Sequence, residues 1–365
     1  MIEKTEIKEE KVVDSTEETA EPTTSTVVAP ITMVEDIFNP KISKVPKGLE
    51  GKTILVYGGN RTGKTKQGTN FPNPFYLGFE MGINGISGIP FRGIQRWSDF
   101  IRVNKELTNQ LTIVKAKALY QTLIFDTVEA AALMCQDFVC QKYGADSIAS
   151  GNEGFGLWQQ YEQEFFRQLN LLSSVGYTLY FISHEGTRKY KDNEGNDYTK
   201  LYPTGDRRSI DPVCNLVDII AYARTNGLDS DGNEILSSLY LTNTKQYHAG
   251  SRFDYLTSYI KEFTAKNLEN AIIASVVAEE KAGHEVSSFE DYQSDNTIVR
   301  KSFKEMKDEV RQYAEKMDSL GRLEEYHAIV AEYLGIGGTA SSTTARQEQQ
   351  VELILSDLKN LNITI

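Results

Sequence analysis

Several features are scarce or absent in this chain of 365 residues, and each excludes a class of protein. Its three cysteines, Cys135, Cys140 and Cys214, are too few for a disulfide framework, so we expect a reducing compartment. No apolar run approaches the roughly 18 residues that cross a bilayer, and the longest one occupies residues 271–278. The chain starts with acidic residues and no apolar segment, unlike a secretory signal. We therefore expect a cytoplasmic protein that neither spans a membrane nor is secreted.

Positive charge is also scarce, since the formal net charge is −12. Residues 1–40 hold ten carboxylates and three lysines, which leaves a net charge of only −5 on the other 325 residues. Proteins that bind nucleic acid over their whole surface are strongly basic. Any surface for nucleic acid in this chain must therefore be local.

The composition divides the chain into four parts. Residues 1–43 mix Glu, Thr, Lys and Pro without apolar periodicity, which predicts a disordered acidic tail; a partner-binding tail is the alternative. Residues 44–262 predict one α/β domain with a mainly parallel sheet flanked by helices. Residues 263–335 have a helical pattern. Residues 336–365 are a Gly/Ser/Thr linker and a last helix, which could dock within the chain or onto a neighbour.

Apolar runs and amphipathic stretches predict the individual elements. Short runs bounded by turn residues are expected to be strands, at 52–57, 74–80, 121–126, 177–183, 217–223 and 239–244. Longer stretches with helical periodicity are expected to be helices, at 128–143, 157–174, 268–281, 300–318, 322–334 and 347–361.

The most specific motif is GGNRTGKT, which matches G-x-x-x-x-G-K-[ST] at every position. It follows an apolar strand and precedes a helical stretch, as a phosphate-binding P-loop does. Backbone amides of such a loop surround the β-phosphate, the lysine reaches the β- and γ-phosphates, and the hydroxyl ligates Mg²⁺. The motif therefore predicts a site for Mg²⁺ and a nucleoside triphosphate, made by Gly58, Gly59, Asn60, Arg61, Thr62, Gly63, Lys64 and Thr65.

Two carboxylates at the ends of apolar runs are the candidates for metal binding and water activation. Asp126 ends the run 123–125, where a Walker B aspartate orients the shell of the Mg²⁺ ion; a helix cap is the alternative. Glu80 ends the strand after the P-loop helix and could polarise an attacking water, unless it is a solvated loop residue. No guanine-binding N-K-x-D motif is found, so ATP is the expected nucleotide.

Four segments, in chain order, resemble the RecA-like AAA-type P-loop ATPases of bacteriophages, which include the single-strand-annealing recombination ATPases. These segments are GGNRTGKT, PFYLGFE, TLIFDTVE and YFISHEG, and the similarity covers residues 44–260. The resemblance implies a RecA-like ATPase that uses ATP and Mg²⁺ and acts on single-stranded DNA in recombination, annealing or replication. It further implies a homo-oligomer with shared ATP sites in the cytoplasm of a bacterial host, and a single-strand DNA-binding protein as an additional partner.

The resemblance also assigns roles to two catalytic candidates besides Lys64 and Glu80. His184, which follows the strand at 177–183, matches the polar residue that senses the γ-phosphate; a strand-end cap is the alternative. Arg252 is the first choice for a basic residue that completes the ATP site of a neighbour, and Lys245 is the second. The loop carries Asn-Arg-Thr where proline and serine are commoner in the family, so the closer subfamily stays open.

A hairpin rich in basic and aromatic residues is predicted directly after His184, because the turn cluster at 192–196 separates two β-prone arms. Cations that meet phosphates and rings that stack on bases hold single strands without sequence readout. A solvated hairpin is the alternative, and the Gly-rich segment 144–156 is a second candidate loop. The predicted DNA-binding residues are Arg188, Lys189, Tyr190, Lys191, Tyr198 and Lys200.

Two other functions are compatible with a P-loop. A nucleotide kinase would need an arginine-rich lid for a second nucleotide, and no convincing one is seen. A nucleotide-binding adaptor or structural protein would bind ATP without turning it over. DNA-stimulated hydrolysis is the property that separates the expected ATPase from both.

Overall fold

The computed structural model describes residues 42–80, 82–109, 111–296, 301–361, 363 and 365. The predicted acidic tail lies outside these residues except for its last two positions. The chain forms two compact units, of which the larger spans residues 41–297 and the smaller contains residues 298–365. The expected boundaries at 262 and 335 do not coincide with this division, because the sheet domain continues past 262 and one helical unit includes both the linker and the last helix.

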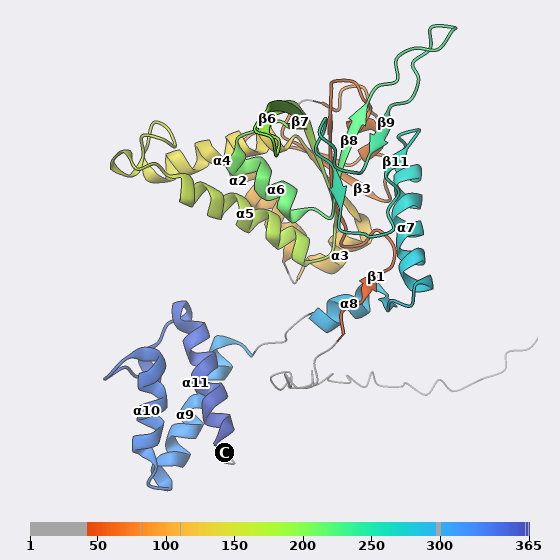
Figure 1. Cartoon of the computed structure of the whole chain (residues 1–365). Helices are drawn as coiled ribbons and strands as arrows, with labels where there is room; N and C mark the ends of the chain where they lie inside the picture. The colour runs from red at the N-terminus through yellow and green to blue at the C-terminus, as the bar shows by residue number, and fades with distance from the viewer. Residues whose placement is uncertain (1–41, 81, 110, 297–300, 362, 364) are drawn as a thin grey trace, which may run out of the picture. The chain divides into compact units, whose positions relative to one another are not determined.

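The larger unit is built on a sheet whose strands follow the order β11-β9-β8-β2-β6-β5-β3-β4 (Figure 1). The middle of this sheet is parallel, which confirms the predicted fold class. The parallel strands are β2 (Thr53–Gly58), β3 (Pro74–Gly78), β4 (Phe91–Gly93), β5 (Thr122–Asp126), β6 (Thr178–Lys191) and β8 (Ile219–Arg224). Antiparallel strands complete the sheet: β7 (Asp197–Pro203), β9 (Ser238–Tyr240), β10 (Gly250–Ser251) and β11 (Tyr259–Ile260).

Helices cover both faces of the sheet, which is why its central strands are continuous apolar runs. One face packs on α2 (Trp97–Thr108), α4 (Val128–Tyr143), α5 (Trp158–Ser174) and α6 (Arg207–Leu216), with α3 (Ile113–Leu119) at its margin. The other face packs on α7 (Ala265–Lys281), and the short helix α1 (Lys64–Gly68) follows the P-loop.

A small parallel pair closes the amino-terminal edge of the sheet. Strand β1 (Val45–Pro46) pairs with β12 (Val286–Ser287), which leads into α8 (Phe289–Asn296). The Phe289 ring lies over Gly51 and Gly176, where a Cβ atom would come within 2.3 and 2.2 Å of it. Glycine is therefore required at both positions for α8 to close this edge.

The smaller unit is a helical bundle of α9 (Phe303–Ser319), α10 (Leu323–Leu334) and α11 (Glu348–Asn360). Helix α9 begins at a capping box, in which the Ser302 side chain accepts from the Glu305 amide and the Glu305 carboxylate accepts from the Ser302 amide. The apolar stripe of α11 packs into the same core as α9 and α10. The last helix thus docks within its own chain. Short 3₁₀ turns lie at η1 (Asn152–Gly154), η2 (Ala340–Ser342) and η3 (Ala345–Gln347).

Among the residues that the structure describes, no helix has both the length and the apolar character needed to cross a membrane.

Candidate nucleotide site

The P-loop connects β2 to α1 at the carboxyl-terminal edge of the sheet. Gly58 packs against β8 so closely that a Cβ atom there would lie 2.1 Å from the carbonyl oxygen of Ala223. Gly63 has φ of 84°, the left-handed conformation that glycine adopts at little cost, and it caps α1. The glycines of the motif are therefore needed for strand packing and for the turn into the helix.

Lys64 is buried and folds back over its own loop. Its Nζ donates to the carbonyl oxygens of Gly58 at 2.9 Å and Gly59 at 2.8 Å. Burial lowers the pKa of the Lys64 ammonium, and nearby carboxylates oppose that shift. These carboxylates, which mark the region that the ammonium faces, belong to Asp126, Glu129, Glu185 and Glu80.

Thr65 and Asp126 meet across the sheet edge, as a magnesium site requires. The Thr65 hydroxyl donates to Oδ2 of Asp126 at 2.7 Å, and the Tyr76 hydroxyl donates to the same oxygen at 3.1 Å. Burial raises the pKa of the Asp126 carboxyl, while these two hydroxyl donors oppose the rise. A buried carboxylate beside a hydroxyl is the donor set that fits Mg²⁺, because the cation would offset the cost of burying the charge. Thr65 and Asp126 would hold the ion there.

Glu80 lies beside Asp126 because β3 and β5 are neighbours in the sheet. Its backbone amide donates to the carbonyl oxygen of Asp126 at 3.0 Å. The Thr127 hydroxyl donates to Oε1 of Glu80 at 2.7 Å, so one carboxylate oxygen is fixed while the residue as a whole is exposed. This position suits a group that orients a water molecule next to a terminal phosphate.

His184 ends the part of β6 that lies inside the sheet, where it pairs with Gly58 of the P-loop. Because β6 runs between β2 and β5, His184 lies between the P-loop and Asp126. Its Nδ1 is 2.5 Å from Oε1 of Glu129, and its backbone amide donates to the same oxygen at 2.9 Å. One oxygen each of Glu80 and Glu129 and one ring nitrogen of His184 all lie within 4.8 Å of one another.

Glu129 is a site residue that the sequence reasoning missed. It belongs to the first turn of α4, three residues after Asp126, within the quoted segment TLIFDTVE. The first turn of a helix that starts directly after a strand lies at the same edge of the sheet as the end of that strand, so Glu129 is close to Asp126. A carboxylate in the first helical turn after the Walker B strand is the sequence signal for this residue.

Arg252 lies at the other end of β8. Strand β10 pairs Ser251 with Ile219, so Arg252 follows at the amino-terminal edge while the P-loop contacts β8 near Ala223. Its guanidinium pairs with Asp218 at 3.3 Å and donates to the carbonyl oxygen of Asn215. The structure therefore does not bring Arg252 to the nucleotide site of its own chain.

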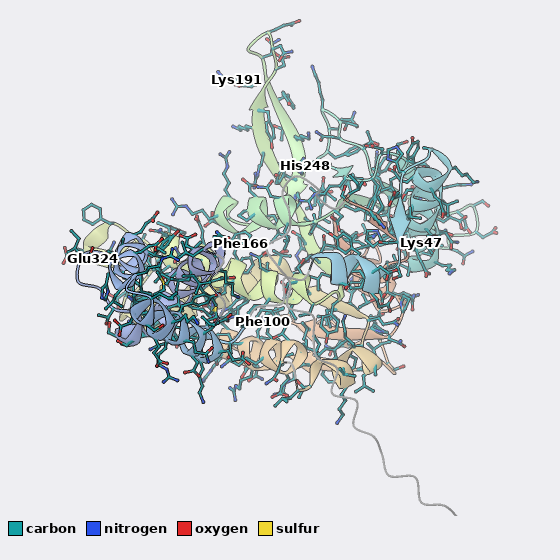
Figure 2. All side chains as sticks on the ribbon, turned by 90° about the horizontal axis from the view of Figure 1, so that it is seen from below. Lys47, Phe100, Phe166, Lys191, His248 and Glu324 are labelled. Atoms are coloured by element: carbon teal, nitrogen blue, oxygen red, sulfur yellow. The ribbon has the colours of Figure 1, made fainter. Side chains whose placement is uncertain are left out.

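The predicted hairpin is present as the outer part of β6 paired with β7, from Glu185 opposite Pro203 to Lys191 opposite Asp197. Figure 2 shows it projecting from the body, with Lys191 near its tip and His248 near its base. Asp192 closes the turn by accepting from the backbone amides of Glu194 at 3.0 Å and Asn196 at 2.9 Å.

The six candidate DNA-binding residues divide between the two faces of this hairpin. Arg188 pairs with Asp211 at 2.5 Å and lies 3.7 Å above the Tyr202 ring, and buried Lys200 donates to Asn243 at 2.6 Å. The rings of Tyr190 and Tyr198 stack on each other on this inner face, with centroids 5.7 Å apart. Lys189 and Lys191 are exposed on the outer face. The structure thus separates cations that the sequence placed in one cluster.

Segment 144–156, the second candidate loop, connects α4 to α5 and exposes Phe155. A cavity of about 410 Å³ opens beside it, where Arg208 of α6 lies 4.4 Å above the Trp158 ring.

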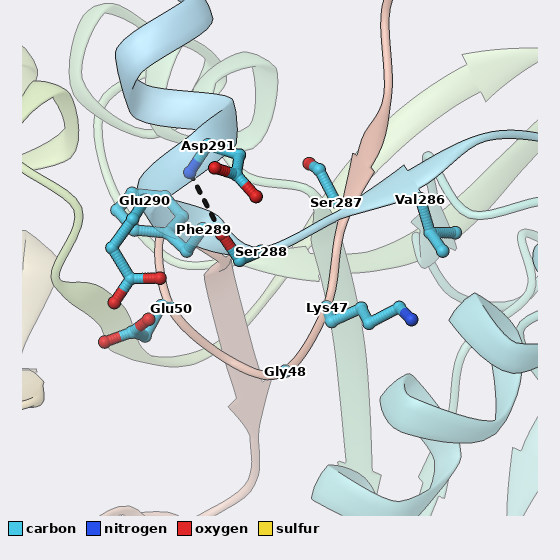
Figure 3. Close-up of a pocket in the computed structure, with 9 residues that line it drawn as sticks. All are labelled: Lys47, Gly48, Glu50, Val286, Ser287, Ser288, Phe289, Glu290 and Asp291. Atoms are coloured by element: carbon cyan, nitrogen blue, oxygen red, sulfur yellow. Dashed lines mark hydrogen bonds between the residues drawn. The ribbon is translucent and has the colours of Figure 1, made fainter.

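Another cavity, of about 540 Å³, lies at the amino-terminal edge, between residues 47–50 and 286–291 (Figure 3). Its carboxylates, Glu50, Glu290 and Asp291, would repel a polyphosphate. Since the P-loop lies at the opposite edge of the sheet, this cavity is separate from the nucleotide site.

The fold and the P-loop geometry define a nucleotide-binding protein of the P-loop class. The family model of the AAA domain matches residues 50–253, and the chain belongs to this family. It is also 42% identical over 330 residues to the SPbeta prophage-derived uncharacterized protein YorG of Bacillus subtilis (strain 168). That similarity covers 90% of this chain and 99% of YorG. The chain is therefore an AAA-type protein with a prophage-derived relative.

Proposed function

We propose that this protein is a Mg²⁺-dependent ATPase that acts on single-stranded DNA during phage recombination, annealing or replication. The observation that carries the proposal is the contact of Thr65 with Asp126 at 2.7 Å beside the buried Lys64 ammonium. Together these groups supply one cation for the phosphates and a hydroxyl and carboxylate for a metal. Membership of the AAA family supports nucleotide use, while the DNA substrate and the RecA-like subfamily belong to the proposal.

The residues divide the hydrolytic work as follows. Backbone amides of the P-loop and Lys64 bind the β- and γ-phosphates. A Mg²⁺ ion held by Thr65 and Asp126 would neutralise charge on those phosphates. Glu80 orients and polarises the attacking water, with one of its oxygens held by Thr127. His184, held by Glu129, contacts the γ-phosphate and registers its loss.

Single-stranded DNA is proposed to meet the outer face of the β6–β7 hairpin. Lys189 and Lys191 are exposed there. Lys245 is also exposed, but it lies on the inner side, 6.0 Å from the Tyr198 ring centroid. The inner-face cations Arg188 and Lys200 support the hairpin from within, because each has a partner inside the protein.

A neighbouring copy is proposed to complete the ATP site, as the resemblance to RecA-like proteins implies. Arg252 is engaged by Asp218, so the exposed Lys245 becomes the better candidate for a cation acting across subunits. The proposal includes the cytoplasm of a bacterial host as the location and a single-strand DNA-binding protein as an additional partner.

A steady-state assay of ATP hydrolysis, with and without a single-stranded oligonucleotide, tests the proposed function. Stimulated release of phosphate is the expected result. Transfer of phosphate to an added nucleoside monophosphate would instead identify a kinase. Tight ATP binding without turnover, with or without DNA, would identify an adaptor or structural protein. Double-stranded DNA of the same sequence is the matched control for strand preference.

A further inference from the structure

A second projection leaves the larger unit between β8 and β9, and we call residues 225–237 the β8–β9 arm (Figure 1). Its tip repeats the turn of the β6–β7 hairpin. Asp229 accepts from the backbone amides of Asp231 at 2.9 Å and Asn233 at 2.8 Å, as Asp192 does in the hairpin. At the base of the arm, Asn226 donates to the carbonyl oxygen of Leu236 at 2.6 Å. The arm is therefore ordered by hydrogen bonds at its tip and its base.

This order does not bury the apolar side chains of the arm. Leu228, Ile235 and Leu236 are 66%, 40% and 46% exposed. Exposed apolar side chains grouped on a projecting and ordered segment are typical of a contact surface. Since the backbone is already held, docking these side chains would cost little further conformational entropy.

The charge of the arm selects its partner. It carries the carboxylates of Asp229, Asp231 and Glu234 and contains no lysine or arginine. Such a segment repels nucleic acid and anionic lipid, and it favours a basic protein surface.

A surface of this kind lies at the opposite end of the same sheet. Residues 91–119, which we call the α2–α3 face, include β4, α2 and α3 and carry six basic and two acidic residues. Leu111 and Val114 are 92% and 78% exposed there, and Lys105 and Lys115 are also exposed. The α2–α3 face thus combines exposed apolar side chains with positive charge, which the arm lacks.

The two surfaces lie too far apart to meet within one copy. Five strand spacings of about 4.8 Å separate β8 from β4 in the sheet. The β8–β9 arm follows β8, whereas the α2–α3 face includes β4. We propose that the β8–β9 arm of one copy docks on the α2–α3 face of a second copy of this chain. Such a contact joins two different surfaces, so it repeats head to tail and generates a ring or a filament. This inference goes beyond the proposed ATPase function and requires neither ATP nor DNA for its test.

The experiment measures the mass of the full chain by sedimentation or light scattering over a range of concentrations, without nucleotide. The parent is expected to form species larger than a monomer, which shrink as salt screens the charges. The variant Leu228→Ser/Ile235→Ser should raise the dissociation constant by about tenfold or more, with unchanged thermal unfolding because both side chains are exposed.

Reversing the charges of the two surfaces provides a more specific test of the contact. Asp231→Lys/Glu234→Lys on the arm and Lys105→Glu/Lys115→Glu on the face should each weaken assembly. In an equimolar mixture, alternating copies pair the reversed arm with the reversed face and the unchanged arm with the unchanged face, so the mixture should assemble, as should a chain that combines both changes.

The hairpin supplies a matched control. Glu194→Lys/Asp197→Lys changes the corresponding positions of the other turn by the same charge, and it should leave assembly unaffected. The proposal is overturned if the parent is monomeric at all concentrations, if the arm variants assemble like the parent, or if the combined chain fails to assemble. Each of these results leaves ATP binding by Lys64 intact, so it is distinguishable from a failure of the proposed function.

Discussion

The P-loop and the β6–β7 hairpin both carry lysines, and they present them in opposite ways. Lys64 is buried and donates to two carbonyl oxygens of its own loop, so its ammonium has one location. Lys189 and Lys191 are exposed on the outer face of an antiparallel ribbon. A buried cation is costly and acts on a single group, whereas exposed cations act over a distance that salt shortens. The geometry of the loop suits the β- and γ-phosphates of one nucleotide, whereas the outer face of the hairpin has the exposed cations that the proposed contact with single-stranded DNA requires.

The largest expected effect comes from removing the buried cation. Lys64→Ala should lower ATP affinity by roughly a hundredfold or more, because the phosphates lose a charged donor in a desolvated site. Calorimetric titration with ATP measures this loss. Lys66→Ala changes an exposed lysine on the same helix and should bind ATP like the parent. Retained affinity in Lys64→Ala would show that the loop does not hold the phosphates.

The next effect separates turnover from binding at the same edge of the sheet. Glu80→Gln should retain ATP binding and slow hydrolysis by about 10²–10⁴, the usual contribution of a general base. Measurements of phosphate release and of ATP affinity on one preparation check this. Glu153→Gln, an exposed glutamate in the segment between α4 and α5, is the control. Unchanged turnover in Glu80→Gln would mean that another group orients the water.

The hairpin is expected to respond more modestly, and differently on its two faces. Lys189→Ala and Lys191→Ala should each reduce the salt dependence of single-strand binding by a slope of about 0.7. Lys200→Met should leave that slope unchanged and lower thermal stability instead, because Lys200 is buried and bound to Asn243. Fluorescence anisotropy at several salt concentrations distinguishes the faces. An equal loss of slope in all three variants would contradict the division of the hairpin.

The smallest effect concerns the packed base of the hairpin, where His248 stacks on Tyr202 with centroids 4.4 Å apart. Burial lowers the pKa of His248 to about 4, and the nearby cations Lys200 and Arg188 add to this shift. The unfolded chain, with a histidine pKa near 6.5, therefore binds the proton first as the pH falls.

Stability contributed by neutral His248 should accordingly be complete above about pH 6.5 and be lost towards pH 4. His248→Phe keeps a stacking ring without a titrating group. Over this range, the free energy of unfolding of the variant should therefore fall by about 1–2 kcal/mol less than that of the parent. Urea unfolding of the parent and the variant at pH 7 and pH 4.5 measures how much the free energy of unfolding of each protein falls between the two pH values. An equal fall in parent and variant would show that His248 is protonated to the same extent in the folded and the unfolded protein.

The elements with strong periodicity could be predicted closely from sequence. Helix α4 spans Val128–Tyr143, as expected, and the expected strand at 121–126 is β5. Helices α2 and α6 were not predicted, because each has an interrupted pattern. In α2 the inward position of Asn104 is polar and becomes acceptable only through its hydrogen bonds to Gln168 of α5. In α6, Pro212 lies inside the helix, which the sequence rule treats as a breaker.

In the candidate site, too, the sequence predicts local features and misses long-range contacts. The P-loop could be recognised because its function depends on backbone conformation, which glycine positions encode locally. Whether a hairpin side chain is available for binding depends on which face it occupies and on what that face packs against. Asp211 and Asn243, which engage Arg188 and Lys200, lie 23 and 43 residues further along the chain. Such long-range partners leave no trace in the spacing of the basic residues.

Strand β6 has a mechanical consequence. It is one uninterrupted strand of 14 residues, of which the first part is clamped between β2 and β5 and the rest forms half of the hairpin. From His184 to Lys191 the free part is about 23 Å long at 3.3 Å per residue. Such a beam is stiffened by its pairing with β7, and a tilt of about 5° at His184 would displace its tip by about 2 Å. Small angular adjustments beside the P-loop are therefore magnified into displacements comparable to an atomic diameter at the far end of the lever.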